Sequence, residues 1–475
     1  MQSKKSFFNK GVFVSLLKRN WPIWLLWLIY RCLSVSGTLF NAYINGAIWT
    51  TYSGILTLIQ SDTFFSFVFA ILSAGVTFNW IFNRRGVNMM STLPVGREAL
   101  YVTAALSALV PVYVCDTLAF ILAFAAEAVN SHLAPGPLLT WYACGLCCDT
   151  FFFLFASFCS MLTGSIAAMP VIYIALSNGI TLAEELCKNV FDKLIYGYNH
   201  SIDKLTYLSP SPLFGFRRPQ ADVFYSYDRV KGYITGVESW QLEKWWVFPM
   251  YAAVGVVFAV IAMAIFKKRK MECAGDIAAF PVLRPVFKYI TAIGGGLAFG
   301  VFVSEIFRTD FAGTKLMIYL ALLMVFGCVI CYFAVEMFIK KSLRVAGKSW
   351  KGCVISCVLL LLFCVATDFN LSGYETYVPA TDEIEGVLIN RVSAFDNPMF
   401  ESGENIARIT ELHKGLIANK SLHDVNTNGE WMLCNIEYAL KNGKTVKRTY
   451  NIQMNDELLK DETSDILSLE SILNT

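Results

Sequence analysis

The chain alternates long apolar runs with short polar segments up to about residue 367, and its composition becomes mixed after that point. Nine of the apolar runs are long enough to cross about 30 Å of hydrocarbon as α-helices. Their approximate limits are 21–44, 63–82, 100–127, 138–162, 165–187, 245–266, 286–307, 316–339 and 350–367. This pattern predicts a polytopic α-helical membrane protein with about nine transmembrane helices.

The nine runs fall into two groups. We expect a first transmembrane bundle of about five helices over 21–187, an extracytoplasmic loop over 188–244, and a second bundle of about four helices over 245–367. Only Thr163-Gly164-Ser165 separates the fourth and fifth runs. A re-entrant hairpin therefore remains an alternative to two full spans there.

The first twenty residues form a basic stretch with an apolar face. At helical spacing that face consists of Phe7, Phe8, Val12, Phe13, Leu16 and Leu17, with lysines on the other side. Such a pattern is typical of a cytoplasmic helix, here over 1–20, that lies in the membrane interface. A solvated tail is the alternative.

From Asp368 onward the sequence has the composition of a soluble domain, and we expect a small α+β extracytoplasmic domain over 368–475. The elements predicted from periodicity are a helix over 405–419 and strands over 387–392, 430–438 and 444–452. The last two strands flank Asn442-Gly443, a pair that favours a hairpin with a type I′ turn.

Composition agrees with a membrane protein. Hydrophobic residues make up 56% of the 475 positions and charged residues 16%, whereas soluble domains usually carry about a quarter charged residues. The formal net charge of +3 is too small to indicate a nucleic-acid partner, and no basic tract is interleaved with aromatic residues. We therefore expect a lipid membrane and no nucleic acid among the partners.

Lysine and arginine are unevenly distributed among the polar segments. They concentrate in the N-terminus and in 84–97, 267–288 and 340–351, which nine helices place on one side of the membrane. The segments 45–62 and 128–137 contain neither residue and fall on the other side. The positive-inside rule then predicts a cytoplasmic N-terminus and an extracytoplasmic C-terminal domain.

The sequence offers little chemistry of its own. A P-loop needs glycines so that backbone amides can close around phosphates, and Gly347-Lys348-Ser349 supplies only the end of that motif. The cluster Cys144, Cys147 and Cys148 has no partner pair and no histidine nearby, which favours buried structural cysteines. We expect no catalytic residue, no cofactor and no metal site, so that any ATP would be bound by a separate subunit.

Three charged residues lie near the middle of predicted helices: Arg31 in the first, Asp116 in the third and Asp149 in the fourth. Charged groups inside a membrane are costly and generally face a bundle interior or an aqueous cavity. One interpretation is an ion pair between Arg31 and one aspartate that fixes helix packing. The other is a polar lining of a transport path.

A sequence motif lies between the second and third predicted helices. The segment 84–98 contains Ser91, Leu93, Pro94 and Arg97 in an arrangement that resembles the cytoplasmic loop of permeases of the type-2 ABC transporter superfamily. The resemblance implies that this loop docks onto an ATPase subunit. The implied docking residues are Arg84, Arg85, Ser91, Leu93, Pro94, Arg97 and Glu98.

A second stretch narrows the resemblance. The segments 267–275 and 279–288 resemble a basic, Gly- and Pro-containing stretch of Ytr-like bacterial permeases, which carry a C-terminal domain of unknown function. Asp382–Glu385 and Lys441–Lys444 resemble parts of that domain. The resemblance implies a permease half in the bacterial plasma membrane, paired with a second permease as a homo- or heterodimer and with separate ATPase subunits. It also implies export linked to antibiotic or cell-envelope stress.

Pro94 is predicted to occupy the first turn of a helix that continues into the third span, because proline needs no N–H partner there. Arg84, Arg85 and Arg97 would then face an ATPase; alternatively they only enforce topology and meet lipid phosphates. Two other functions stay open for the whole chain. A membrane sensor or assembly protein would use the outer domain to bind a ligand or partner, and an enzyme acting on lipid-linked substrates would need clustered catalytic groups that the sequence does not show.

Overall fold

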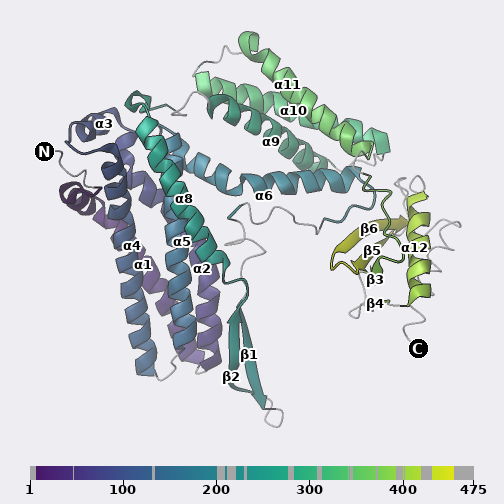
Figure 1. Cartoon of the computed structure of the whole chain (residues 1–475), viewed down its shortest axis with the longest axis horizontal. Coiled ribbons are helices and arrows are strands. Elements are labelled where there is room, and N and C mark those ends of the chain that lie inside the picture. The colour runs from purple at the N-terminus through teal and green to yellow at the C-terminus, as the bar shows by residue number, and fades with distance from the viewer. Residues whose placement is uncertain are drawn as a thin grey trace. The chain divides into compact units, whose positions relative to one another are not determined.

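The computed structural model describes most of the chain. The described ranges are 7–45, 48–130, 134–200, 209–210, 221–228, 233–276, 283–307, 313–340, 342, 346–370, 373–391, 399–400, 402–418 and 431–453. They divide into two compact units, Met1–Thr181 with Leu205–Arg284 and Leu182–Lys204 with Pro285–Thr475 (Figure 1). Each unit is described by itself below.

The first unit is a helix bundle with a β-hairpin. Its elements are α1 (Lys10–Asn45), α2 (Ile48–Thr77), η1 (Asn79–Ile81), α3 (Arg84–Ser91), α4 (Arg97–Asn130), α5 (Pro135–Leu162), the first half of α6 (Ala168–Leu194), β1 (Ala221–Asp228), β2 (Tyr233–Leu242), α8 (Val247–Lys268) and η3 (Met271–Cys273). Helix α5 packs against α2, α4 and α8, and α1 packs against α4 and α2. A helix that is apolar on all sides belongs in the middle of a bundle, and α5 is buried along most of its length.

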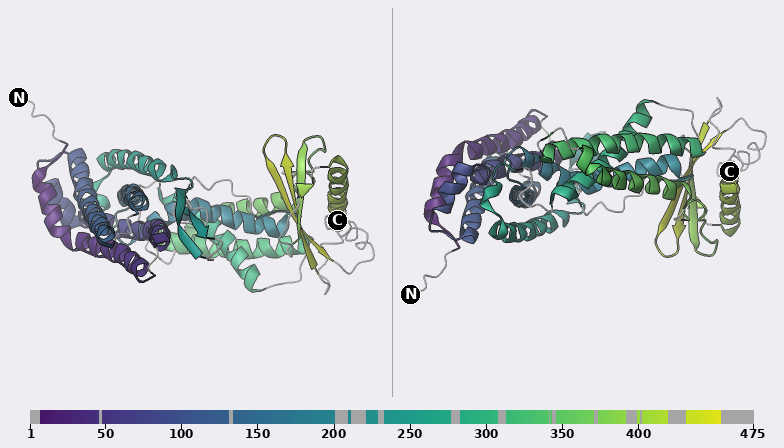
Figure 2. Two further views of the ribbon diagram at one scale, coloured as in Figure 1. Left: turned by 90° about the horizontal axis from the view of Figure 1, so that it is seen from below. Right: turned by 90° about the horizontal axis from the view of Figure 1, so that it is seen from above.

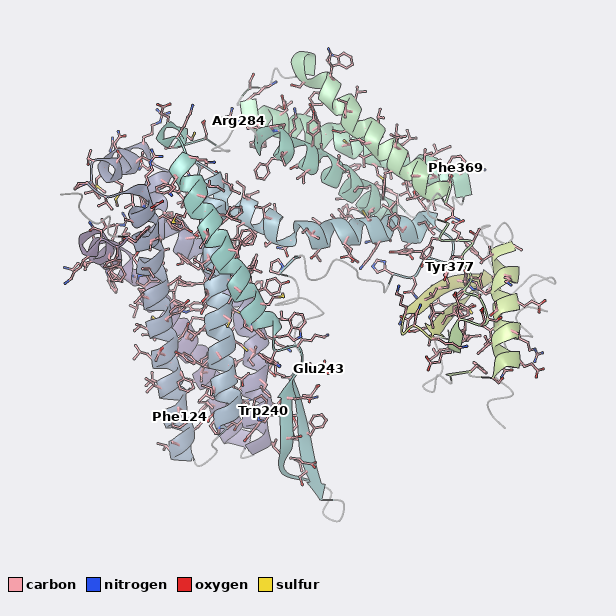
Figure 3. The ribbon with its side chains drawn as sticks, viewed as in Figure 1. Phe124, Trp240, Glu243, Arg284, Phe369 and Tyr377 are labelled. Carbon is pink, nitrogen blue, oxygen red and sulfur yellow. The ribbon has the colours of Figure 1, made fainter. Side chains whose placement is uncertain are left out.

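Contacts between helix ends show the direction in which each helix of the first unit runs. The amide of Asn9 donates to Thr103 Oγ1 over 3.1 Å, so α1 starts beside the first turns of α4. The ends of α2, α5 and α8 lie at that same end of the bundle, where Arg269 after α8 contacts Ile81 and Ser160. At the opposite end the Trp240 side chain on β2 covers the start of α5 at Gly136 (Figure 3). Helices α5 and α8 therefore run parallel.

The second unit contains three long helices and the C-terminal domain. Its elements are the second half of α6, α9 (Leu283–Ile306), α10 (Gly313–Lys340), α11 (Ala346–Asp368), β3 (Ile384–Arg391), β4 (Met399–Phe400), α12 (Gly403–Ala418), β5 (Trp431–Leu440) and β6 (Thr445–Gln453). One apolar core joins the end of α6 to α9, α10 and α11. A second core lies between α12 and an antiparallel sheet of order β4-β3-β5-β6, with α12 against one face (Figure 2).

Eight helices in the described part of the chain are long and apolar enough to cross a membrane: α1, α2, α4, α5, α8, α9, α10 and α11. Many large apolar side chains on them are exposed, as lipid contact requires; Phe124 on α4 is an example (Figure 3). The chain is therefore a polytopic α-helical membrane protein. The expected fifth span forms helix α6, but it carries Glu184, Glu185 and Lys188 and is not among the eight.

Two predicted boundaries differ from the structure near the N-terminus. Helix α1 runs without a break from Lys10 to Asn45, so residues 10–20 of the expected interfacial helix continue directly into the first span without a helix end between them. Pro22 lies inside this helix. Helix α2 begins at Ile48, whereas the sequence predicted its start at 63; most of the expected outer segment 45–62 is therefore helical.

The C-terminal domain follows the predicted pattern of one helix and antiparallel strands, although the turn type was wrong. Among described residues Gly443 has φ = 75° whereas Asn442 is not in the positive-φ region, so the turn is not type I′. Leu440 N–H donates to Lys444 O, and Gly443 N–H donates to Leu440 O. The loop is thus the three-residue kind, with glycine in the left-handed position. Residues 392, 419 and 430, at the predicted element ends, lie outside the described ranges.

Candidate functional site

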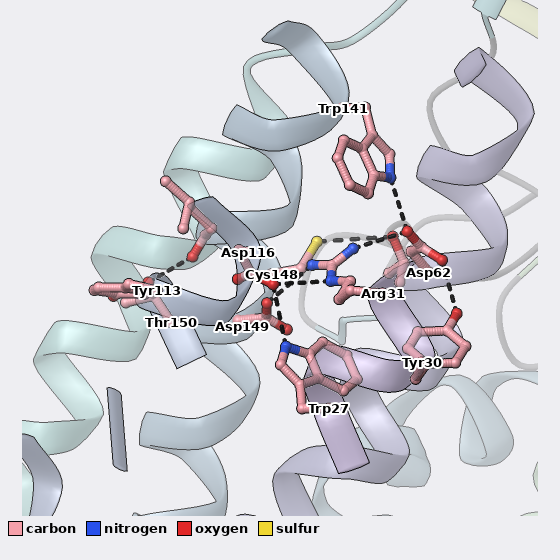
Figure 4. Close-up of polar contacts among 12 residues, drawn as sticks. Trp27, Tyr30, Arg31, Asp62, Tyr113, Asp116, Trp141, Cys148, Asp149 and Thr150 are labelled. Atoms are coloured by element: carbon pink, nitrogen blue, oxygen red, sulfur yellow. Dashed lines mark hydrogen bonds and ion pairs between the residues drawn. The ribbon is translucent and has the colours of Figure 1, made fainter. Parts of the chain in front are cut away.

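A buried charge cluster forms where four helices of the first unit meet (Figure 4). Arg31 on α1 makes ion pairs with Asp62 on α2, Asp116 on α4 and Asp149 on α5. The donor–acceptor distances are 2.7 Å from Nη1 to Asp62, 2.9 Å from Nε to Asp116 and 3.0 Å from Nη2 to Asp149. The structure thus brings together the three intramembrane charges singled out in the sequence and adds a fourth, Asp62.

All four residues of this charge cluster are removed from solvent. Their exposed fractions are 1% for Arg31, 3% for Asp62, 3% for Asp116 and 5% for Asp149. Two tryptophan rings close the cluster, with the guanidinium carbon 4.9 Å from the ring centroid of Trp27 and 5.3 Å from that of Trp141. Contacts of this kind stabilise a desolvated guanidinium and exclude water from it.

The aspartates differ in the hydrogen bonds that they accept. Asp62 accepts the most hydrogen bonds of the three. Its Oδ1 accepts from Tyr30 and Ser34, and its Oδ2 accepts from Arg31 and Trp141. Tyr30, Arg31 and Ser34 lie on one face of α1 because three or four residues make one helical turn. Each oxygen of Asp62 therefore accepts two hydrogen bonds.

Asp116 and Asp149 share one edge of the guanidinium. Asp116 Oδ1 accepts from Arg31 Nε and from Trp27 Nε1 over 2.9 and 3.1 Å, and Asp149 Oδ2 accepts from the neighbouring Nη2. The other oxygen of Asp116, Oδ2, is buried and accepts no hydrogen bond within the described residues. This asymmetry separates Asp116 from Asp62.

The sequence interpretation missed Asp62 because it began the second span at 63 and assigned the preceding residues to an outer loop. The apolar run Ile55–Ile59 and the lack of proline before it were signals for an earlier start. Asp62 is not near a helix end but in the middle of α2.

A second feature of the first unit is an arginine junction formed by Arg269, Arg97 and Gly164 with their partners. Arg269, 2% exposed, donates through Nη1 to the carbonyl oxygens of Ser160 and Met161 over 3.0 and 3.2 Å. Its Nη2 donates to Ile81 O over 3.4 Å. The last carbonyls of a helix have no partner within it, so Arg269 supplies donors to the end of α5 and to η1.

Arg97 and Gly164 tie two more segments into the arginine junction. Arg97 Nη1 donates to the carbonyl oxygens of Lys267 and Arg269 over 2.8 and 3.0 Å. Gly164 N–H donates to Asp276 O, and its own carbonyl accepts from Gly275 N–H. A Cβ atom at Gly164 would overlap the carbonyl oxygen of Cys273, so only glycine allows this approach. The start of α4, the end of α5 and the end of α8 are thereby held together.

Helix α3 stands on the same end of the bundle and belongs to the resemblance motif. The side chain of Asn83 caps the helix by accepting a hydrogen bond from the amide of Arg85. Val87 and Met90, both in α3, have buried side chains. Arg84 and Arg85 are exposed and make no side-chain hydrogen bond within the described residues. Helix α3 therefore packs against the bundle through its buried side chains and exposes two arginines to solvent.

Of the other docking residues implied by the resemblance, some are exposed and some are bonded within the chain. Ser91, Leu93 and Pro94 are exposed in and after the last turn of α3. Pro94 is not in a helix, because α4 begins only at Arg97; the prediction that it opens the third span is wrong. Glu98 forms an ion pair with Lys267, so Arg97 and Glu98 both bond within the chain.

The cysteine cluster singled out in the sequence lies on α5. No group of three or more His, Cys, Asp or Glu side chains in the described part of the chain is arranged to hold a metal ion. Cys144 and Cys148 are buried in α5 with free thiols. The segment 279–282, part of the second resemblance motif, lies outside the described residues.

Comparison with known proteins gives no relative. No family model matches the chain, and neither a curated protein nor a solved structure matches it at a significant level.

Proposed function

We propose that the chain is the permease subunit of an ATP-driven ABC transporter of the type-2 superfamily. The observation that supports this most is helix α3: a short, packed helix between two spans, with Arg84 and Arg85 free at its edge. Such an element can receive an acidic surface of an ATPase subunit, since charge complementarity steers and orients a docking partner.

The arginine junction supports a coupling role for this end of the bundle. Helix α3 is joined by five residues to α4, whose first residue, Arg97, holds the end of α8, and Arg269 holds the ends of η1 and α5. A displacement of α3 would therefore be transmitted to several spans at once. The chain would bind no ATP itself, and a second permease would complete the translocation path.

The proposed orientation places this end in the cytoplasm. Lys10, Arg84, Arg97 and Lys267 all lie at the end of the bundle where α1 and α4 begin. Because α5 and α8 run parallel, the chain between them has to return from one end to the other. We assign that crossing to the segment that contains α6, which restores the nine crossings needed for an extracytoplasmic C-terminal domain. Export linked to antibiotic or cell-envelope stress remains part of the proposal through the sequence resemblance alone.

Reversal of the free charges on α3 tests the proposal. The variant Arg84→Glu with Arg85→Glu should insert normally but lose most of the ATP-binding subunit that co-purifies from native membranes in mild detergent, together with ATP hydrolysis by the complex. Arg97→Glu is a poorer probe, because it would also break the contacts to Lys267 and Arg269.

Lys268→Glu with Lys270→Glu is the matched control, since both lysines are exposed at the same end of the bundle and the net charge changes equally. The control should keep the ATPase. Wild-type assembly and ATP turnover in the α3 variant would sink the docking role. If the wild-type chain brings down no subunit with a nucleotide site, the sensor or assembly function takes its place.

A further inference from the structure

The buried charge cluster is not electrically balanced. One guanidinium faces three carboxyl groups in the described part of the chain, and all four side chains are at least 95% removed from solvent. Full ionisation would leave an excess of two negative charges among apolar helices. An unpaired ionised group is too costly there, and such a site takes up a counter-charge or neutralises a group instead.

Asp62 is not the group to be neutralised. Its two oxygens accept from Tyr30, Ser34, Arg31 and Trp141, which stabilises the ionised carboxylate. The pairing of Asp62 with Arg31 balances one charge of each sign. The excess therefore resides on Asp116 and Asp149.

Asp116 and Asp149 are close enough to repel each other strongly. The N–H groups on Nε and Nη2 of an arginine lie side by side and usually bind the two oxygens of one carboxylate. Here they bind one oxygen from each of two carboxyl groups. Like charges brought together in this way cannot both ionise, as carboxylate dyads in other proteins show.

An independent observation points to the missing partner. Asp116 Oδ2 is fully buried in the cluster and accepts no hydrogen bond from any described residue. An unpartnered carboxylate oxygen in such surroundings is the natural position for a bound proton.

A metal cation fits the cluster less well than a proton. The guanidinium of Arg31 occupies the centre that a metal ion would need, and it already repels a second positive charge. We propose that Asp116 and Asp149 form a buried proton-binding site in which one proton is shared between the two carboxyl groups. The shared proton removes one of the two excess negative charges, and the other stays beside the guanidinium of Arg31, to which both carboxyl groups bond. The inference does not depend on the transport proposal. Where the chain does act as a permease, loading of this site is coupled to the packing of α1, α4 and α5.

Infrared spectroscopy of the whole protein in lipid tests the proposal without any mutation. A protonated carboxyl group has a carbonyl stretch distinct from that of a carboxylate, and the band should shift in D₂O. It should also shift when the protein is made with aspartate labelled with ¹³C at the side-chain carboxyl carbon. A wild-type protein at neutral pH that shows no aspartic acid band would overturn the proposal.

Variants then assign the band. Asp116→Asn and Asp149→Asn should each abolish it, because the remaining carboxyl group ionises against Arg31, whereas Asp62→Asn should leave it in place. Denaturation at neutral pH should release about one proton more from the wild-type protein than from Asp116→Asn. The site is instead a cation site if sodium or potassium at constant ionic strength stabilises the wild-type protein but not Asp116→Asn. That result, like a band that survives both variants, would rule out the shared proton.

Discussion

Two of the arginines that the structure describes in the first unit are buried, and they are stabilised in different ways. Arg31 is surrounded by carboxyl groups from three other helices, whereas the guanidinium of Arg269 donates, among the described residues, to backbone carbonyl oxygens at the ends of η1 and α5. Carbonyl groups at a helix end carry a partial negative charge that cannot be removed by protonation. The first cluster can therefore change its charge, while the second is a fixed clamp.

The effect of burial on the pKa of Arg269 agrees with its role as a fixed contact. Removal from water lowers the pKa of Arg269 to about 10, with a small opposing effect of Cys273. The guanidinium therefore stays charged at neutral pH and holds its carbonyl partners over the whole physiological range. A fixed clamp suits a junction that passes on movement, and a titratable cluster suits a site that is loaded and emptied.

The largest effect is expected for Arg31→Met. Removing the only cation described within 4 Å of the three aspartates leaves a buried excess charge, and breaking a buried pair costs about 3–5 kcal/mol in soluble proteins. The melting temperature in detergent should fall sharply. Adding Asp62→Asn should restore part of the loss, since it removes one of the two negative charges that remain when Asp116 and Asp149 share a proton.

Arg31→Lys is the control, because it keeps the positive charge but loses the planar arrangement of donors in the guanidinium. A lysine can satisfy one or two of the three carboxyl groups and should be intermediate in stability. If the double variant Arg31→Met with Asp62→Asn is no more stable than Arg31→Met, the cluster is held by shape and not by charge balance.

A smaller loss is expected for Arg269→Met. Three carbonyl oxygens would lose a charged donor, and the expected cost is about 2–3 kcal/mol, because water can reach the helix ends once the side chain is shortened. The comparison predicts a qualitative difference as well. The loss at Arg269 should be the same at about pH 6 and about pH 9, whereas Arg31→Met should be less destabilising at the lower pH, because protons can then replace the missing positive charge. Melting curves at both pH values decide this.

Gly164→Ala should come next in size. The new methyl group would overlap Cys273 O and break the backbone hydrogen bonds that join the α5–α6 link to Gly275 and Asp276. We expect a cost of about 1–3 kcal/mol. Gly179→Ala in α6 is the matched control, because no atom lies within 4 Å of its Cβ position and alanine favours a helix by about 1 kcal/mol. Equal melting temperatures for the two variants would show that the arginine junction does not depend on this approach.

The sequence predicted the features that depend on composition and local periodicity. Eight of the nine expected spans, the C-terminal helix and the hairpin at Gly443 follow from runs of apolar residues and from turn chemistry. It could not predict features that depend on tertiary contacts. Arg269 looked like one member of a basic tract, and only the fold shows that it turns inward while Lys268 and Lys270 stay exposed.

The charge cluster was predictable only in part, for the same reason. A mid-helix Arg31 implied a carboxylate partner, because an unpaired charge is expelled from a bundle. The number of partners depended on where α2 begins, and placing its start at 63 excluded Asp62. Pro94 shows the opposite error: local preference favoured a helix start, but the chain uses it in the link that lets α3 pack separately from α4.

The C-terminal domain contains a third kind of buried polar group, and its effect should be the smallest. His413 lies between two hydroxyl groups, with Nδ1 2.9 Å from Tyr438 Oη and Nε2 2.7 Å from Tyr450 Oη, and no described carboxylate bonds to it. Burial, helped by Arg448, lowers the pKa of His413 to about 4.

Because the folded domain disfavours the charged ring, its stability is full above the ordinary histidine pKa of about 6.5 and falls as the pH drops toward the folded pKa. Between about pH 7 and about pH 5.5 the loss should be about 1 kcal/mol. Hydrogen exchange of β5 and β6 in the full chain, corrected for the intrinsic rate, measures it. His413→Gln removes the titrating group while its side-chain amide still offers hydrogen bonds to the tyrosines, so protection in this variant should not depend on pH. If the wild-type and His413→Gln chains respond alike, another group titrates. If protection of β5 and β6 increases as the pH falls, His413 gains a counter-charge on protonation and behaves like the Arg31 cluster after all.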